Sequence, residues 1–209
     1  MNQPALYLAS ASPRRGDLLT LLGVSYRSVV ANCDESVRPG EHPLAYVRRL
    51  ALAKARAGAA AAGAVAAPVL GADTAVVLGR QILGKPRDRD EGLAMLAALS
   101  GREHRVLTAV AVVQGARAEL ALSDSRVRFA ESTEAERIAY WNTGEPADKA
   151  GAYAVQGLGA VFITRIRGSH SGIMGLPLRE TAVLLKAFSV SVFPWTLAAD
   201  VRGRMPTIP

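Results

Sequence analysis

The sequence predicts an α/β or α+β protein built around a mixed β-sheet. Short apolar runs rich in β-branched residues alternate with segments of helical periodicity along the 209-residue chain, and neither an internal repeat nor a linker divides them. Hydrophobic residues make up 50% and charged residues 21% of the chain, a mixture typical of globular proteins. We expect a single domain over residues 1–189, followed by a weakly patterned tail over residues 190–209 that is extended or loosely docked.

Residues that start and stop helices set the expected elements of the N-terminal third. Ser12 followed by Pro13 is a good helix start, because serine is a preferred N-cap and proline is tolerated in the first turn. Gly23 ends this helix, and Pro43 opens a longer one. The expected elements are a strand at Leu6–Ala9, a helix from Pro13 to about Leu22, a strand at Ser25–Val30, a helix from Pro43 to about Ala60 and a loop up to Ala67.

The central segment, residues 69–86, reads VLGADTAVVLGRQILGKP and predicts a β-hairpin. Two short strands joined at Gly79 would return Asp73 and Lys85 to the same neighbourhood. The segment from Gly79 to Lys85 also matches the G-x-x-x-x-G-K spacing of a phosphate-binding P-loop, but the next residue is Pro86. Proline supplies neither the hydroxyl nor the N–H that such a loop needs. We therefore reject the P-loop and keep the hairpin.

The C-terminal half continues the alternation of helices and strands. Asp88 is placed to cap a helix, and the segment that begins at Ser132 resembles a capping box. The expected elements are a helix at Glu91–Leu99, strands at His104–Val113 and Glu119–Phe129, a helix from Ser132 to Trp141, a strand at Ala160–Ile166, a turn at Gly168–Gly172 and a helix at Leu178–Phe188.

Composition limits the partners and the compartment. The net charge of +7 fits either a polyanionic partner or a solvated basic surface, but aromatic residues are only 5%, which argues against nucleic acid. The uncharged stretch Ala57–Ala72 is too weakly hydrophobic to span a membrane, and the first ten residues have no secretory signal. The single Cys33 fits a reducing compartment. We therefore expect a cytoplasmic protein that does not cross a membrane.

Two arginines stand where a helix disfavours cations. Arg14 and Arg15 occupy the predicted first turn after Ser12, and the helix dipole opposes positive charge there. We expect an anion beside them, with pairing to Asp17 as the alternative. Lys54 lies on a basic helix and would join this site only if its side of the helix faces the same cleft.

Carboxylates follow or interrupt the apolar runs at two places. Asp34 and Glu35 form an acidic turn, and Asp73 lies in the hairpin. Carboxylates in such places bind a divalent cation, or they only cap a loop. Together with the arginines and lysines they suit a phosphate ester, because cations bind phosphate oxygens while carboxylates hold a magnesium-type ion and activate water. The residues alone predict binding of a nucleotide or another phosphate compound, and they leave its hydrolysis open.

Other common catalytic centres find no support. The segment Gly168–Gly172 places histidine where a nucleophile elbow needs serine. The histidines have no zinc-binding spacing, and we expect each on the surface or in a loop rather than as a catalytic base. They are His42, His104 and His170.

Seven short motifs resemble, in their order along the chain, those of the Maf family of nucleoside triphosphate pyrophosphatases. The resemblance runs from about Leu6 to about Phe188. The motifs are LASASPRR at 8–15, GADT at 71–74, LGKP at 83–86, LSG at 99–101, DKAGAY at 148–153, QG at 156–157 and GLPL at 175–178.

This resemblance implies an α/β fold in which helices flank a mixed, elongated sheet and two lobes surround a central cleft. It also implies that a nucleoside triphosphate is cleaved between its α and β phosphates with a divalent metal, Mg²⁺ or Mn²⁺, and that the protein forms a homodimer. Asp73 would be the general base or a metal ligand, and Glu35, or its neighbour Asp34, would assist at the metal. The residues expected to bind the phosphates are Ser12, Arg14, Arg15, Lys54 and Lys85.

Two further positions resemble one branch of the family. The branch with threonine after the aspartate and glutamine before the late glycine, as at Thr74 and Gln156, prefers dTTP and UTP. The other branch has glutamine and glutamate there and prefers 7-methyl-GTP. An amide can both donate and accept hydrogen bonds at a pyrimidine edge. We expect hydrolysis of dTTP, UTP and related modified pyrimidine nucleotides; a 7-methyl-GTP enzyme and a non-catalytic binder of DNA or a division protein are the alternatives.

Overall fold

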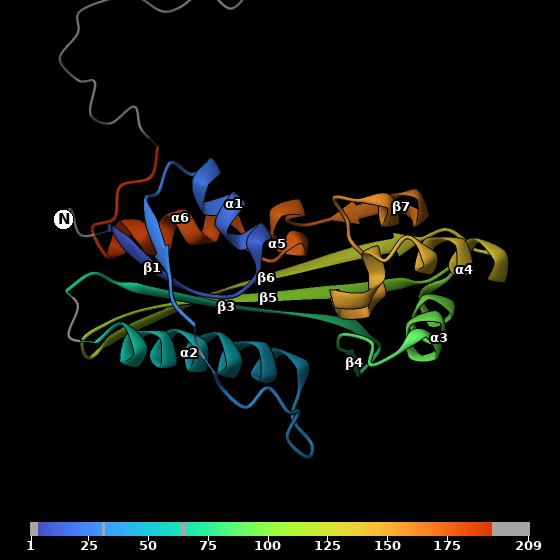
Figure 1. Cartoon of the computed structure of the whole chain (residues 1–209), viewed down its shortest axis with the longest axis horizontal. Helices are drawn as coiled ribbons and strands as arrows, with labels where there is room; N and C mark the ends of the chain where they lie inside the picture. The colour runs from blue at the N-terminus through green and yellow to red at the C-terminus, as the bar shows by residue number, and fades with distance from the viewer. Residues whose placement is uncertain (1–3, 31, 64–65, 194–209) are drawn as a thin grey trace, which may run out of the picture.

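The computed structural model describes residues 4–30, 32–63 and 66–193, and its elements form layers around one long sheet (Figure 1). The strands are β1 (Leu6–Ala9), β2 (Tyr26–Ser28), β3 (Val69–Leu78), β4 (Gln81–Leu83), β5 (Glu103–Gln114), β6 (Arg117–Phe129) and β7 (Ile163–Arg167). The α-helices are α1 (Pro13–Leu21), α2 (Pro43–Ala62), α3 (Arg89–Leu99), α4 (Glu134–Asn142), α5 (His170–Met174) and α6 (Leu178–Ala187). Short 3₁₀ helices cover Glu145–Asp148, Ala150–Ala152 and Leu158–Phe162.

The seven strands form one mixed sheet. Their order is β2-β1-β3-β5-β6-β7, and β4 pairs with β3 outside this path. β1 is parallel to both of its neighbours, and every other pair is antiparallel. Figure 1 shows α2 on one face of the sheet and α1, α5 and α6 on the other. The predicted α/β fold, a mixed sheet flanked by helices, is therefore confirmed.

One face of the sheet carries two separate hydrophobic cores. Even-numbered positions of β3 share this face, because successive side chains of a strand alternate. Leu70 packs in the core covered by α1 and α6, whereas Val76 packs in the core covered by α3 and α4. Thr74 lies between them on β3, directly opposite Thr108 of β5. A pair of threonines therefore marks the gap between the two cores.

The other face of β3 is covered closely by α2. A Cβ atom added at Gly71 would lie 2.4 Å from the backbone nitrogen of Ala55 and 2.5 Å from the carbonyl oxygen of Ala51. Only glycine permits this approach. Asp73 is two residues further along the strand and so shares the face of Gly71. The close packing therefore brings Asp73 beside α2.

One edge of β3 is open in the middle of the strand. β1 pairs with β3 only at Val69–Gly71, and β4 pairs with it only at Val76–Leu78. Because β1 is parallel to β3, the loop after Ala9 arrives at the open stretch. Because β4 is antiparallel to β3, the loop after Leu83 arrives there from the opposite direction. Two segments far apart in the sequence thus converge on residues 72–75.

Several predicted boundaries are wrong, each for a physical reason. β3 has ten residues rather than being a short strand, because it runs across both cores. β2 keeps only Tyr26–Ser28, the residues that pair with β1. Ala160–Phe162 belong to a 3₁₀ helix, so β7 begins at Ile163. The predicted turn at Gly168–Gly172 contains the start of α5, which Ser169 caps by accepting from the N–H of Gly172.

His104 is a core residue, and the prediction that it lies on the surface or in a loop is wrong. Its side chain is 2% exposed in β5, and its ring meets that of Phe129 edge-on at 5.1 Å. Its Nε2 is hydrogen-bonded to the hydroxyl of Tyr153 at 2.9 Å. Burial lowers the pKa of His104 to about 4, so the ring is neutral near pH 7. His42, which caps α2, and His170 are exposed, as expected.

The first residues of the predicted tail are docked on the body of the protein. Val190 is buried in the core under α1 and α6, and the N–H of Phe193 donates to the carbonyl of Leu22 at 2.8 Å. The rest of the tail, residues 194–209, lies outside the described residues, as do residues 1–3 of the predicted signal-free N-terminus. No helix within the described ranges has the length and apolar character needed to cross a bilayer.

Candidate active site

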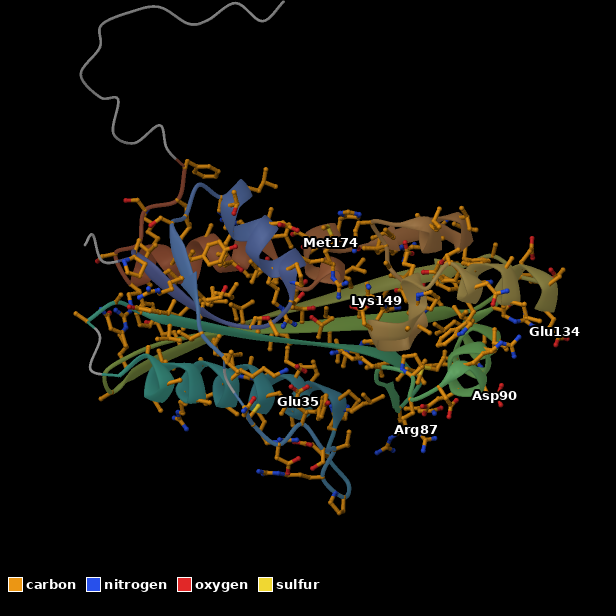
Figure 2. All side chains as sticks on the ribbon, viewed as in Figure 1. Glu35, Arg87, Asp90, Glu134, Lys149 and Met174 are labelled. Carbon is orange, nitrogen blue, oxygen red and sulfur yellow. The ribbon has the colours of Figure 1, made fainter. Side chains whose placement is uncertain are left out.

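A cavity of about 490 Å³ opens at the exposed edge of β3 and is lined from several elements. Its wall includes the start of α1, the acidic turn before α2, the loop after β4, the 3₁₀ segments and the end of α5. Figure 2 shows Glu35, Lys149 and Met174, three of the lining residues, near the middle of the long axis. All nine predicted site residues line this cavity: Ser12, Arg14, Arg15, Glu35, Lys54, Asp73, Thr74, Lys85 and Gln156.

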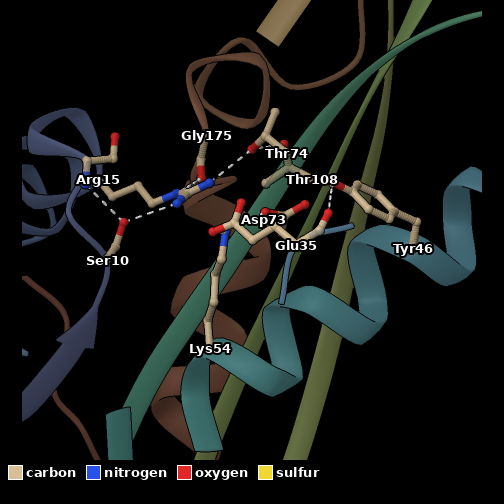
Figure 3. Close-up of polar contacts among 10 residues, drawn as sticks. Ser10, Arg15, Glu35, Tyr46, Lys54, Asp73, Thr74, Thr108 and Gly175 are labelled. Atoms are coloured by element: carbon tan, nitrogen blue, oxygen red, sulfur yellow. Dashed lines mark hydrogen bonds and ion pairs between the residues drawn. The ribbon is translucent and has the colours of Figure 1, made fainter. Parts of the chain in front are cut away.

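An ion-pair network with one lysine between two carboxylates lies in this cavity. The ammonium of Lys54, from α2, is 2.8 Å from Oδ1 of Asp73 and 2.9 Å from Oε1 of Glu35 (Figure 3). Asp73 is 5% exposed, whereas the side chain of Glu35 is 56% exposed. The Lys54 side of α2 therefore faces the cleft, which was the condition set by the sequence.

Asp73 combines burial with an unused oxygen. Its Oδ2 is buried and has no hydrogen-bond partner among the described residues. Burial raises the pKa of Asp73, and the charge of Lys54, its hydrogen bond and the charge of Arg15 oppose this rise. A carboxylate with a raised pKa and a free lone pair is suited to accept a proton or to bind a cation.

Glu35, rather than Asp34, is the acidic residue of this turn that reaches the cleft. Asp34 is exposed, and its Oδ1 accepts a hydrogen bond from the N–H of Ser36 at 2.9 Å. The hydroxyl of Tyr46 donates to the carbonyl oxygen of Glu35 at 3.1 Å and so ties this turn to α2. Burial raises the pKa of Tyr46 to about 12, so this hydroxyl keeps its proton near pH 7. Sequence reasoning did not identify Tyr46, which also lines the cavity.

Arg15 reaches the cleft from α1 and is held by three hydrogen bonds. Its Nε donates to the carbonyl oxygen of Gly175 at 2.9 Å, one terminal nitrogen donates to Ser10 at 3.0 Å, and the other donates to Thr74 at 3.3 Å (Figure 3). Burial lowers the pKa of Arg15, and the charge of Asp73 opposes this shift. Within the described chain, neither Arg15 nor Arg14 forms the ion pair with Asp17 that was the alternative.

Three predicted phosphate-binding residues lie on the cavity wall with polar atoms to spare. Ser12 is the N-cap of α1, as predicted, but its hydroxyl forms no capping bond. Arg14 is half-buried, and Lys85 is exposed beyond the end of β4. Neither cation forms an ion pair within residues 4–30, 32–63 and 66–193. These groups are free to meet an anionic ligand.

A further cation, Lys149, lines the cavity and was not singled out as a site residue. Its ammonium pairs with Asp148 and lies 3.4 Å from the carbonyl oxygen of Glu145. The N–H of Gly151 donates to the carbonyl oxygen of Gly84 at 2.9 Å, which links this segment to the loop before Lys85. The DKAGAY motif contains Lys149, but only the 3₁₀ turns direct it toward the cleft.

The remaining wall is mostly apolar. It belongs to the core covered by α3 and α4, and its members in the cavity are Val76, Val106, Tyr153, Val155, Ile173 and Met174. Gln156 follows this wall directly and is exposed. The cavity therefore offers cations and carboxylates beside an apolar surface with an adjacent amide, a combination that accommodates a charged group joined to a flat, partly polar one.

The fold and this cleft define an α/β protein whose cation-rich cavity, built around a buried carboxylate–lysine pair, is suited to a phosphate compound. The family model described as Maf-like protein matches residues 5–188. The chain belongs to the Maf family, as its motifs indicated.

Similar proteins support this membership over most of the chain. A protein of Saccharophagus degradans is 51% identical over 194 residues, which covers 92% of each chain. A protein of Burkholderia orbicola is 54% identical over 200 residues, covering 90% of this chain and 95% of that one. A protein of Hahella chejuensis is 51% identical over 189 residues, covering 90% and 94%. All three are named dTTP/UTP pyrophosphatase.

Proposed function

We propose that this chain is a nucleoside triphosphate pyrophosphatase that hydrolyses dTTP, UTP and related modified pyrimidine nucleotides to the monophosphate and pyrophosphate. The observation that carries the proposal is the buried carboxylate of Asp73, held by Lys54 in a cavity that also presents Arg14, Arg15 and Lys85. A protein that only binds phosphate has no need for a buried carboxylate among its cations. The names of the relatives support the same activity and substrates.

The reaction uses the free oxygen of Asp73 and the surrounding cations. A water molecule attacks the phosphorus on one side of the α–β bridge, and its proton passes to Oδ2 of Asp73. The bond from that phosphorus to the bridging oxygen breaks, and its electron pair leaves with the departing phosphate group. Arg14, Arg15 and Lys85 stabilise the charge that develops on the phosphate oxygens. Lys54 keeps the Asp73 carboxylate oriented and favours its ionised form.

A divalent cation, Mg²⁺ or Mn²⁺, is part of the proposal. The unpartnered buried oxygen of Asp73 and the exposed carboxylate of Glu35, both from residues that contact Lys54, are oxygen ligands of the kind these ions prefer. Among the described residues, no group of three or more His, Cys, Asp or Glu side chains is arranged to hold a metal ion by itself. Asp73 and Glu35 would hold the ion together with substrate phosphates. When bound, the ion supplies charge stabilisation and activation of water.

Three further properties accompany this proposal. For the dTTP/UTP preference, we assign the amide of Gln156 to the edge of the pyrimidine base, where it both donates and accepts hydrogen bonds. We also assign Thr74 a part in the choice of substrate. The lone Cys33 supports a cytoplasmic location. A homodimer follows only from the family resemblance, and the domain limit at residue 189 stays a prediction.

The first prediction tests catalysis with purified protein, a panel of triphosphates and Mg²⁺, Mn²⁺ or a chelator. Pyrophosphate is measured separately from orthophosphate. We expect pyrophosphate from dTTP and UTP, and we expect Asp73→Asn to lower kcat by about 10²- to 10⁴-fold because it removes the proton acceptor. The matched control is Asp34→Asn, which makes the same change on an exposed aspartate outside the cavity and should keep wild-type turnover.

Two outcomes would contradict the proposal. Turnover of no triphosphate, together with salt-sensitive DNA binding, favours the non-catalytic alternative. Turnover of 7-methyl-GTP in preference to dTTP and UTP favours the other branch of the family.

A further inference from the structure

A chain of hydrogen bonds crosses the floor of the cleft and connects four elements. It begins at Arg15 of α1, which donates to the hydroxyl of Thr74 on β3 at 3.3 Å. The hydroxyl of Thr74 lies 2.9 Å from that of Thr108 on β5. Thr108 donates to the carbonyl oxygen of Gly172 in α5 at 2.7 Å. Figure 3 shows Arg15, Thr74 and Thr108 together beside Asp73.

The chemistry of the groups sets the direction of every proton in this chain. A threonine hydroxyl has one proton, and a backbone carbonyl can only accept. The proton of Thr108 is therefore committed to Gly172, so Thr74 must donate its own proton to Thr108. Because Arg15 has only donors, it must donate to Thr74. Thr74 has no proton left to offer to a nucleobase.

The segment that contains Gly172 also binds Arg15 directly. Nε of Arg15 donates to the carbonyl oxygen of Gly175, which lies three residues after Gly172. The guanidinium is thus attached to one segment twice, once directly and once through two threonines. With a third bond to Ser10, three of its five N–H groups are used. The remaining two are a pair of donors for phosphate oxygens.

We propose that Thr108 and Thr74 are positioning residues that orient the guanidinium of Arg15 toward the triphosphate, and that Thr74 influences the substrate through Arg15 rather than by contact with the base. This inference rests on the proposed function of the same site. Thr108 is fully buried, and it lies in none of the motifs that indicated the site. It is nevertheless directly opposite Thr74 in the sheet register.

The alternative is that Thr108 only stabilises the fold by joining β5 to α5. The positioning role and the structural role predict different effects of Thr108→Val and Thr108→Ser on activity. Thr108→Val keeps the shape of the side chain but removes the hydroxyl, which leaves Thr74 without an acceptor and the Gly172 carbonyl without its donor. Thr108→Ser keeps the hydroxyl. A buried control exists in α6, where Thr181 is 0% exposed and its hydroxyl has no hydrogen-bond partner among the described residues.

The test compares Thr108→Val, Thr108→Ser and Thr181→Val, each also combined with Arg15→Lys. Lysine keeps the charge but lacks the planar fork that the threonines orient. We expect Thr108→Val to lower kcat/KM for dTTP by about 10- to 100-fold, as a misplaced binding group does. Thr108→Ser should stay within about threefold of wild type, and Thr181→Val should have wild-type activity. In the Arg15→Lys background, Thr108→Val should cost less than about twofold, because coupled residues are not additive.

Assays are run well below the melting temperature of each variant, which is measured alongside. An equal loss from Thr108→Val in both backgrounds overturns the inference in favour of a structural role, and so does wild-type kcat/KM in Thr108→Val. If the wild-type protein binds dTTP without turning it over, Kd for dTTP replaces kcat/KM in the same comparison. If the wild type neither binds nor hydrolyses any triphosphate, the proposed function fails, and this inference fails with it.

Discussion

At the scale of single residues, the environment of Asp73 decides what this cleft can do. Its carboxylate is buried under α2, yet one oxygen has no partner among the described residues. Lys54 contacts the other oxygen and also contacts Glu35. An aspartate that is desolvated but only half neutralised is a stronger base than an exposed one. Burial of this charged group also lowers the stability of the folded protein.

A prediction at this scale concerns the acid limb of activity. Because burial raises the pKa of Asp73 above the ordinary value of 3.8, kcat/KM should begin to fall on acidification above that value. Lys54→Met removes the main interaction that lowers this pKa, so the residual activity of that variant should show an acid limb at still higher pH. The measurement is kcat/KM for dTTP between pH 4 and 8. A limb in Lys54→Met at or below that of the wild type would contradict the assignment of Asp73 as the base.

The same shift predicts how stability depends on pH. A carboxyl whose pKa is raised by folding contributes its stabilisation fully below the unfolded value, near 3.8, and this contribution is lost as pH rises through the folded pKa. The free energy of unfolding of the wild type minus that of Asp73→Asn should therefore decrease as pH rises from about 4 toward neutrality. Urea unfolding of both proteins across this range measures the difference. An increase with pH would mean that Lys54 and Arg15 outweigh burial.

At the scale of elements, two pairings leave room for the site. β1 and β4 occupy the same edge of β3 but leave residues 72–75 without a partner strand there. On the covered face, α2 approaches β3 so closely at Gly71 that an added Cβ would meet helix backbone. The contact between Lys54 and Asp73 depends on this approach. Close backbone packing at Gly71 thus lets the ammonium of Lys54 lie 2.8 Å from Oδ1 of Asp73.

A prediction at this scale is that Gly71→Ala weakens both the fold and the site. The new methyl group must push α2 away from β3, because the nearest atoms belong to helix backbone. We expect a loss of about 1–3 kcal/mol in the free energy of unfolding, together with a lower kcat as Lys54 moves from Asp73. The stability control is Gly84→Ala, where nothing lies within 4 Å of the new methyl group and the change should be about 0.5 kcal/mol or less. Equal urea midpoints for both variants would show that α2 does not rest on Gly71 in this way.

At the scale of the whole molecule, the cleft separates two hydrophobic cores that share one sheet. The core under α1 and α6 lies beyond Thr74 on one side, and the core under α3 and α4 lies beyond it on the other. Arg15 comes from the first side, and Gln156 follows the apolar wall of the second. The residues that we expect to contact the substrate therefore come from both halves of the molecule.

A prediction at this scale concerns substrate choice. Thr74→Gln combined with Gln156→Glu changes one position on the floor of the cleft and one at its far wall. The two substitutions introduce the residues expected at these positions in the 7-methyl-GTP branch. The ratio of dTTP to 7-methyl-GTP hydrolysis should fall, because the glutamate loses the donor that the amide offered. Each single variant measures how much its own position contributes to the change in this ratio. If the ratio does not move in the double variant, these positions do not select the base.

Much of the fold and of the candidate site could be predicted from local chemistry. Asp88 caps its helix as its residue type indicated, and a capping box lies within the segment that begins at Ser132. The motifs contained seven of the nine predicted residues that line the cavity, and the other two, Glu35 and Lys54, were assigned from the acidic turn and the basic helix. Two missed residues left partial signals. Thr108 is a lone hydroxyl between Val106 and Val110 on one face of β5, and Lys149 lies within a recognised motif. Neither signal predicts which residues the side chain contacts in the folded protein.

By itself, the sequence determined the alternation of helices and strands, the basic character of the chain and the identity of the charged groups that line the cleft. These are local properties, because capping, periodicity and composition depend on neighbouring residues. Tertiary structure alone decided that His104 is buried, that Glu35 rather than Asp34 reaches Lys54, and that Thr74 gives its proton to Thr108. Each of these depends on strand register and on the approach of α2 to β3, which bring together residues that are far apart along the chain.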